Sequence, residues 1–258
     1  MYFNDIHILV YVALGIVGMY IGRFLAWCNK RLPEKQKVFT KEYFTESKKD
    51  VKYTYLFMIA TAAIYIALLY KFGINDTFFK NLDLIKYLIL VPMLELTFSI
   101  DLKHRIIPNR LTMTMFETGV ILAFIYGIGN INILREMFCG MLAGGGIFLS
   151  ITLLGGLVAG KEAMGLGDVK FMGAVGLFVG TTLVAESAFL AFILAAIVSI
   201  VIIIVRKLIT KSEDDLIAFG PFLALSVLLC IFMPSKIVFV KFAEFCGYLS
   251  TLLIKVIG

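Results

Sequence analysis

Long apolar stretches alternate with short polar segments along almost the whole chain. Most of these stretches approach the roughly 20 residues that a helix needs to cross a bilayer. They predict membrane-spanning helices at residues 6–27, 53–72, 83–100, 111–128, 133–159, 169–181, 183–205, 216–233 and 236–256. The sixth stretch is short and directly precedes the seventh, so the two are either separate crossings or one broken pair. We therefore expect eight or nine spans.

Basic residues concentrate in every second polar segment. The segments after the first, third, fifth and seventh spans carry Lys30, Arg31, Lys35, Lys37, Lys41, Lys48, Lys49 and Lys52, then Lys103, Arg105 and Arg110, then Lys161 and Lys170, then Arg206, Lys207 and Lys211. Loops rich in lysine and arginine face the cytoplasm, so we expect the N-terminus to lie outside. The alternation requires the sixth and seventh spans both to cross, which favours nine spans.

The composition agrees with a membrane protein. Hydrophobic residues make up 60% of the 258 residues, against about 45–50% in soluble domains, and the mean hydropathy is +0.96. The alternating pattern of a transmembrane β-barrel is absent from the sequence. The first apolar run is too long, and too poor in basic residues before it, for a cleaved signal peptide. We predict an all-α, multi-pass membrane helix bundle in the cytoplasmic membrane, surrounded by the lipid bilayer.

Charge and cysteine content narrow the function classes. The net charge of +6 follows from the loop pattern, so we expect no nucleic-acid partner. The cysteines are scattered and form no Cys-x-x-Cys pair: Cys28, Cys139, Cys230 and Cys246. Such spacing supports neither a disulfide framework nor a zinc site. We expect no bound metal, and cysteines that act as small packing residues.

Two aspartates stand out because the predicted topology puts them at the same depth. Asp101 ends the third span in "LTFSIDLKHRIIPNR", and Asp168 begins the sixth in "GLGDVKF". An ionisable group at a membrane boundary is costly unless it is hydrated, paired or functional. Two carboxyl groups that approach closely share a proton, so that one can activate a water molecule while the other protonates a carbonyl oxygen. This is the chemistry of aspartic proteases.

The glycines beside Asp168 fit that chemistry. Gly165 and Gly167 allow a positive φ or a close approach to another backbone. A substrate peptide must be extended at the bond to be cut, and a glycine-rich stretch leaves room for it. The alternative is a turn that begins a helix with Asp168 as its N-cap, and GxGD by itself does not decide between the two.

The remaining acids and histidines suggest structural roles. Glu95 lies near Pro92 in the third span, and we expect it to form hydrogen bonds inside the bundle. Glu117 and Glu186 are expected to be structural or to lie near an interface, and His104 to lie at headgroup level. No Ser-His-Asp or Cys-His set can be assembled, because the two histidines are predicted on opposite sides of the membrane.

Four stretches together resemble the type IV prepilin peptidases, which are intramembrane aspartic proteases of the GxGD class. "IDLKHRIIPNRLT" is similar to that family's first aspartate motif and "KEAMGLGDVKF" to its second. "AFGPFLAL" (218–225) resembles a third family stretch, with Ala218 where proline is usual, and "GRFLAWCNKRLP" (22–33) resembles a segment of the bifunctional members. The resemblance covers most of the chain.

The resemblance implies a function. Family members cut the basic leader from type IV prepilins and pseudopilins after a glycine, at the cytoplasmic face of the membrane. Asp101 and Asp168 would be the catalytic pair. The scaffold and substrate-binding residues would be Glu162, Gly165, Gly167 and Lys170 of the second motif, with Pro108 and Asn109 of the first. The peptidase reaction needs no cofactor, and the sequence leaves open which prepilins are cut.

The N-terminal part departs from the family pattern. Many bifunctional members carry two Cys-x-x-Cys pairs in the first cytoplasmic loop and methylate the new N-terminus with S-adenosylmethionine. Here the loop, residues 28–52, is short and holds only Cys28, while Arg23 and Ala26 replace a serine and an asparagine. We expect residues 1–52 to be a remnant of the methyltransferase-type region and 53–258 to form the peptidase core. Methylation stays open, and with it the need for S-adenosylmethionine.

Two other classes of membrane protein also use acidic residues within the bilayer. Signal-peptide-peptidase and presenilin-type proteases carry a Tyr-Asp pair and a Pro-Ala-Leu stretch, whereas Ile100 precedes Asp101 here. An ion or solute transporter would use Asp101 and Asp168 as cation-binding carboxylates. Such transporters tend to show inverted repeats and acidic residues at the membrane midplane. Here Asp101 and Asp168 lie at the predicted cytoplasmic boundary, and no repeat is evident in the sequence.

Overall fold

The computed structural model describes residues 2–3, 6–38, 51–74, 78–159, 164–209 and 218–257, and nearly all of them are helical. The helices are α1 Ile8–Arg31, α3 Val51–Phe72, α4 Phe78–His104, α5 Asn109–Gly129, α6 Ile131–Ala159, α7 Leu166–Ile209, α8 Gly220–Phe232 and α9 Ile237–Ile257. Two very short strands, β1 Tyr2–Phe3 and β2 Ile6–His7, pair antiparallel before α1. The predicted all-α membrane bundle is confirmed.

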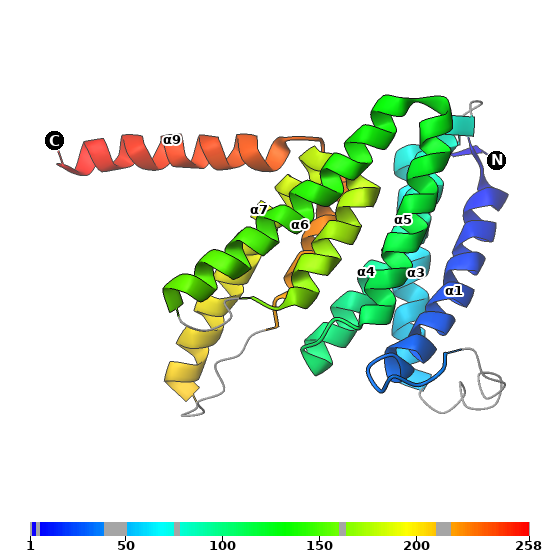
Figure 1. The fold of residues 1–258 in the computed structure, drawn as a ribbon, viewed down its shortest axis with the longest axis horizontal. Coiled ribbons are helices and arrows are strands. Elements are labelled where there is room, and N and C mark those ends of the chain that lie inside the picture. The colour runs from blue at the N-terminus through cyan, green and yellow to red at the C-terminus, as the bar shows by residue number, and fades with distance from the viewer. Residues whose placement is uncertain are drawn as a thin grey trace.

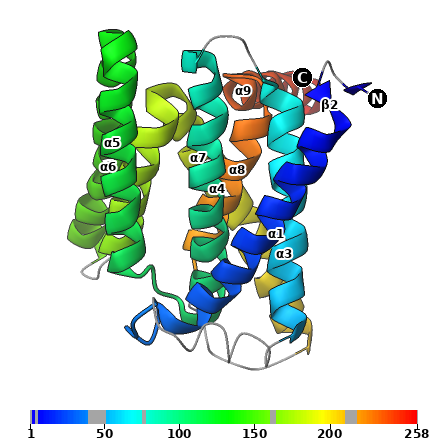
Figure 2. The ribbon, with the colours of Figure 1, turned by 90° about the vertical axis from the view of Figure 1, so that its right-hand side faces the viewer.

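Most of the helices stand side by side in a bundle (Figures 1 and 2). In the described part of the chain, α1, α3, α5, α6 and α7 are each long and apolar enough to cross a membrane. Helix α4 runs beside them but carries Lys86, Glu95 and Asp101 along its length. The predicted total of eight or nine crossings remains a prediction.

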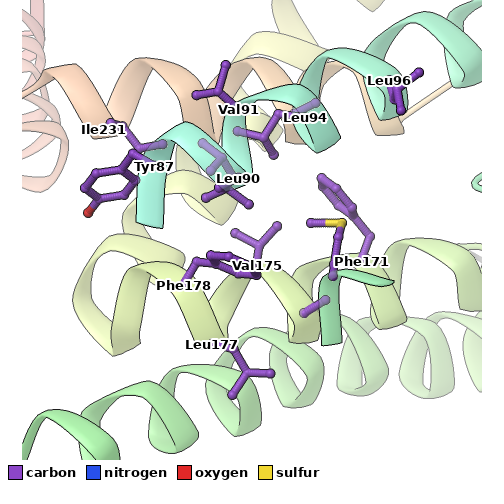
Figure 3. Close-up of a cluster of buried hydrophobic side chains, with 14 of the residues drawn as sticks. Tyr87, Leu90, Val91, Leu94, Leu96, Phe171, Val175, Leu177, Phe178 and Ile231 are labelled. Carbon is purple, nitrogen blue, oxygen red and sulfur yellow. The ribbon is translucent and has the colours of Figure 1, made fainter. Parts of the chain in front are cut away.

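The centre of the bundle is an apolar contact between α4 and α7. Tyr87, Leu90, Val91 and Leu94 of α4 lie between α7, which contributes Phe171, Val175 and Phe178, and α8, which contributes Ile231 (Figure 3). The spacing of three and four residues on both helices is that of one buried helix face. All of these side chains are less than 10% exposed. This contact holds α4 and α7 together near the middle of α4.

Helix α7 is two helices joined at Gly180, whose φ of 78° breaks the helix. A Cβ added at Gly144 of α6 would lie 2.3 Å from the carbonyl oxygen of Met172 and 3.0 Å from Cγ2 of Val184. Twelve residues of straight helix would separate Met172 from Val184 by about 18 Å. Both can contact one point of α6 only because the chain turns back at Gly180. The sixth and seventh predicted spans are thus two antiparallel arms, residues 166–179 and 181–209.

The reversal is supported by a carboxylate from another helix. The backbone N–H of Thr181 donates a 2.9 Å hydrogen bond to Oε1 of Glu136 in α6. A carboxylate at this position satisfies a free N–H at the start of the second arm and complements the helix dipole. Nothing in the local sequence around Gly180 identifies Glu136 as this partner, because the two are far apart in the chain.

Helix α1 packs mainly on α3. A Cβ at Gly18 would lie 2.7 Å from Cα of Ala62, and one at Gly22 would lie 2.5 Å from the carbonyl oxygen of Phe57. The predicted domain boundary near residue 52 therefore falls between two helices in intimate contact.

Candidate active site

Asp101 lies in the last turn of α4 and is buried, with 5% of its surface exposed. The helix ends three residues later, and Arg105 takes a positive φ of 56° with its N–H bonded to the Asp101 carbonyl. The carboxyl group therefore sits at the point where the chain leaves the bundle. Its neighbours Lys103 and Arg105 are exposed.

The carboxylate of Asp101 is anchored by the start of α8. The backbone N–H of Gly220 donates a 2.9 Å hydrogen bond to Oδ2 of Asp101. Gly220 is the first residue of α8, Pro221 follows it without an N–H, and the helix has no capping side chain of its own. Asp101 thus takes the place of an N-cap, where a negative charge is favourable.

Only glycine fits at position 220 in this arrangement. A Cβ added to Gly220 would lie 2.6 Å from Oδ2 of Asp101 and 2.8 Å from Cγ. The preceding residue is held by an aromatic cluster, because Phe219 lies 5.3 Å from the ring of Phe192 in α7 and 6.3 Å from that of Phe148 in α6. The stretch 218–225 resembles a family motif, but nothing in the sequence identifies Gly220 as the partner of Asp101.

Asp168 lies in the first turn of α7, at the same end of the bundle as Asp101. Its backbone N–H donates to the carbonyl of Gly165 at 3.0 Å, so it is a residue inside the first turn and not the N-cap. The two carboxyl groups lie close enough for the charge of Asp101 to affect the ionisation of Asp168. The structure thus brings the two predicted acids into one electrostatic site, although 67 positions separate them in the sequence.

Gly165 and Gly167 show neither the positive φ nor the close approach to another backbone that the sequence suggested. Among the described glycines, positive φ values occur at Gly73 and Gly180. A Cβ at Gly167 would meet Ile107 at 3.5 Å, and one at Gly165 would lie 3.8 Å from Oδ2 of Asp168, which are ordinary contacts. A Cβ at Gly165 would thus be in ordinary contact with the Asp168 carboxyl group.

A hydrogen bond joins the two aspartate motifs. Nζ of Lys170 donates to Oδ1 of Asn109 at 3.3 Å. Asn109 is the first residue of α5 and Pro108 is its N-cap, with the extended conformation expected of proline. Lys170, Asn109 and Pro108 therefore lie together near the aspartates. Glu162, the remaining predicted scaffold residue, lies outside the described residues.

The other acids behave as structural groups. Oγ1 of Thr61 donates a 2.5 Å hydrogen bond to Oε2 of Glu95. This agrees with the interior hydrogen-bonding role expected for Glu95. Glu186 is buried on the second arm of α7, at the other end of the bundle from Asp101.

Neither a metal site nor a methyl-donor site is found in the described part of the chain. Groups of three or more histidine, cysteine or acidic side chains do not occur there. A cavity of about 660 Å³ lies between α1, α4 and α5 under residues 37–38, but its lining is mainly apolar and its charged groups are Lys37 and Arg110. S-adenosylmethionine has ribose hydroxyls and an ammonium group that need acceptors such as carboxylates. These lining residues do not fit it, and we derive no methyl-transfer step.

Comparison with known proteins gives a consistent result. The model of the type IV leader peptidase family matches residues 88–204, which include both aspartates. The chain is 32% identical to Leader peptidase HopD of Escherichia coli over 139 residues, 54% of this chain and 86% of that protein. It is 30% identical over 142 residues to the Prepilin leader peptidase/N-methyltransferase of Legionella pneumophila, which is 54% of this chain and 46% of that protein.

A third relative is the Type 4 prepilin-like proteins leader peptide-processing enzyme of Escherichia coli O78:H11, 30% identical over 136 residues, which cover 53% of this chain and 47% of that protein. The aligned part of the chain thus spans about half the length of the first curated relatives it matches. No solved structure matches.

Proposed function

The chain belongs to the type IV leader peptidase family, and on this basis we propose that it is an intramembrane aspartic endopeptidase. Its substrates would be type IV prepilins or pseudopilins, cut after a glycine between the basic leader and the apolar segment. The observation that carries the proposal is the pair of acids at one end of the bundle, with Asp101 held by Gly220 and Asp168 near enough to be affected by the charge of Asp101.

The two carboxyl groups would share the work of hydrolysis. One takes a proton from water as the water oxygen adds to the scissile carbonyl carbon, and the other gives a proton to the carbonyl oxygen. The tetrahedral intermediate then breaks the C–N bond, and the departing amine takes up a proton. Because Oδ2 of Asp101 already accepts the Gly220 N–H, its other oxygen is the one free to face water or substrate.

The membrane boundary is a suitable place for this reaction. The leader of such a substrate is water-soluble and its following segment is apolar, so the bond between them lies at the bilayer surface. We propose that the aspartate end of the bundle faces the cytoplasm and the N-terminus the outside of the inner membrane. The exposed basic residues Lys103, Arg105 and Arg110 at this end follow the positive-inside rule.

A cleavage assay in membranes tests the proposal. The enzyme is co-expressed with a prepilin-like substrate, and wild type is compared with Asp101→Asn and Asp168→Asn. Each substitution keeps the shape of the side chain but removes its acid–base function, so we expect cleavage to fall by about 10²-fold or more. Intact-mass analysis of the product also shows whether a methyl group has been added.

The matched control is Asp83→Asn, at the far end of the same helix as Asp101. Oδ1 of Asp83 accepts hydrogen bonds from Tyr126 and Lys86, and the amide oxygen of asparagine can also accept them. This variant should cleave at the wild-type rate. Full cleavage by Asp101→Asn or Asp168→Asn, in protein that inserts normally, would contradict the acid pair and reopen the transporter interpretation.

A further inference from the structure

Helix α9 does not continue the direction of the bundle. It is bent by 103° from α8 and runs away across the end of the bundle opposite the aspartates (Figures 1 and 2). Its 21 residues would be long enough to cross a bilayer at 1.5 Å per residue. Because α8 stands among the other helices of the bundle, a helix nearly perpendicular to it lies roughly in the plane of the membrane.

The end of α8 is held by a cation. Nζ of Lys71, in the last turn of α3, donates to the carbonyl oxygens of Ile231 at 2.5 Å and Met233 at 3.4 Å. The last carbonyls of a helix lack partners within that helix and carry the negative end of its dipole. Lys71, from the neighbouring helix α3, supplies these carbonyls with a hydrogen-bond donor and a positive charge at the end of α8.

The start of α9 is held by an anion. The carboxylate of Glu186, on the second arm of α7, lies next to the backbone N–H groups of Lys236 and Val238 and near the positive charge of Lys236. Lys236 takes a positive φ of 66° directly before the helix begins. A positive charge thus ends α8 and a negative charge begins α9, each favourable for its helix dipole. The bend is fixed on both sides by the body of the protein.

Aromatic contacts fix the rotation of α9 about its own axis. The ring of Phe189, next to Glu186 on α7, lies 5.6 Å from that of Phe239 and 4.8 Å from that of Phe242. Phe239 and Phe242 are three residues apart and therefore share one side of the helix. That side faces the bundle, yet both rings remain about 40% exposed.

Polar residues occupy the opposite side of α9. They recur at intervals of three and four, as Lys241, Glu244 and Tyr248. Nζ of Lys241 and Oε2 of Glu244 form an exposed ion pair at 2.7 Å. At 100° per residue, this stripe lies on the side of the helix away from Phe239 and Phe242. The helix has one apolar and one polar face, and the bundle fixes which way each points.

We propose that α9 is an interfacial helix that lies in the plane of the bilayer at the face opposite the aspartates. Its Phe239–Phe242 side enters the acyl region beside α7, and its Lys241–Glu244 side lies among the headgroups and water. An in-plane helix of this kind needs one apolar face and one charged face. A membrane-spanning α9 would instead expose Lys241 and Glu244 to lipid, break the contacts at Glu186 and Lys71, and carry the C-terminus to the aspartate side.

Cysteine accessibility tests the proposal. In a variant whose four native cysteines are replaced by alanine, single cysteines are placed at Lys241 and Glu244 on the polar side and at Phe242 on the apolar side. Asn130 and Lys103, both exposed, serve as references for the two ends of the bundle. A membrane-impermeant maleimide is applied to right-side-out and to inverted membranes.

We expect cysteines at 241 and 244 to react in the same preparation as the Asn130 cysteine and at a similar rate. The Phe242 cysteine should react at least about tenfold more slowly, because a thiol among acyl chains does not ionise readily. Protection of positions 241 and 244 in both preparations, or their labelling from the Lys103 side, would overturn the proposal.

A second measurement does not depend on these substitutions. A protease-cleavable tag after Gly258 in the otherwise native chain should be cut from the Asn130 side of the membrane. Cutting from the Lys103 side alone would show that α9 crosses the bilayer. Both experiments measure membrane topology and not cleavage activity, so their outcomes do not depend on the proposed peptidase function.

Discussion

At the scale of single residues, the hydrogen bond from Gly220 to Asp101 determines how one of the two acids is presented. The bond uses a backbone N–H at the start of α8, so the carboxylate is oriented by a rigid helix and not by a flexible side chain. Asp168, by contrast, lies in the first turn of α7, with Gly165 beside its carboxyl group. The two side chains are chemically identical, but only Asp101 is shown to accept a hydrogen bond from the start of another helix in the described part of the chain.

Gly220→Ala should reduce cleavage while the protein still folds. The added Cβ would meet Oδ2 of Asp101 at 2.6 Å, so the carboxylate or the start of α8 must move. A displacement near 1 Å in a catalytic group costs about 10²-fold in rate. We expect kcat to fall by roughly that factor with a smaller change in KM, as measured by single-turnover cleavage in detergent.

Gly146→Ala is the control for this prediction, because a Cβ there meets nothing within 4 Å. It should leave both the rate and the melting temperature close to wild type. A Gly220→Ala enzyme that cleaves at the normal rate would show that the contact with Gly220 does not set the geometry of Asp101.

At the scale of the elements, glycines allow α6 and α7 to approach at backbone distance. A Cβ at Gly140 would lie 2.3 Å from the carbonyl oxygen of Gly176, and one at Gly176 would lie 2.1 Å from that of Gly140. The Gly-x-x-x-Gly pairs 140/144 and 176/180 thus face each other, as such pairs do in membrane helix contacts. This contact holds the first arm of α7, which begins at the Asp168 site.

Gly140→Ala should destabilise the bundle by about 1–3 kcal/mol, the usual cost of overpacking. The atom in the way is backbone, so no side-chain rotation can relieve the contact. Gly146→Ala on the same helix should be neutral or slightly stabilising, since alanine favours a helix over glycine by about 0.5–1 kcal/mol. Unfolding in mixed detergent measures both, and equal effects at the two positions would contradict the close α6–α7 contact.

At the scale of the whole molecule, the two ends of the chain are attached very differently. Helix α1 lies along α3, and its Gly18 and Gly22 contact the backbone of Ala62 and Phe57. Helix α9 contacts the bundle near its own beginning, through Glu186 and Phe189. The N-terminal helix is part of the packed body, whereas the C-terminal helix extends from it.

Removal of residues 1–52 should therefore cost more stability than removal of 237–258. The first deletion exposes a helix face built to contact another backbone, and we expect the melting temperature in detergent to fall by more than about 4 °C, the effect of roughly 1 kcal/mol or more in a chain of this size. The second deletion should lower it less. The reverse order would contradict the view that α1 belongs to the same packed body as the aspartate site.

Part of this architecture is predictable from the sequence, because it depends on local composition. Apolar runs long enough to cross a bilayer fix where the helices lie, and the predicted spans agree with α1, α3, α5 and α6 to within a few residues. Asp101 and Asp168 could be singled out because a carboxyl group beside an apolar run is costly wherever it falls. The motifs around them are also continuous in the chain.

The rest was decided by contacts between distant parts of the chain. Gly220 meets Asp101 across 119 positions, Glu136 supports the turn at Gly180 from another helix, and Lys71 and Glu186 hold the bend before α9. The stretch 236–256 has the length and apolar content of a span, and only these tertiary contacts direct it across the bundle. Hydropathy measures how strongly a segment prefers lipid to water. The direction in which the segment runs depends on which partners satisfy the polar groups at its ends.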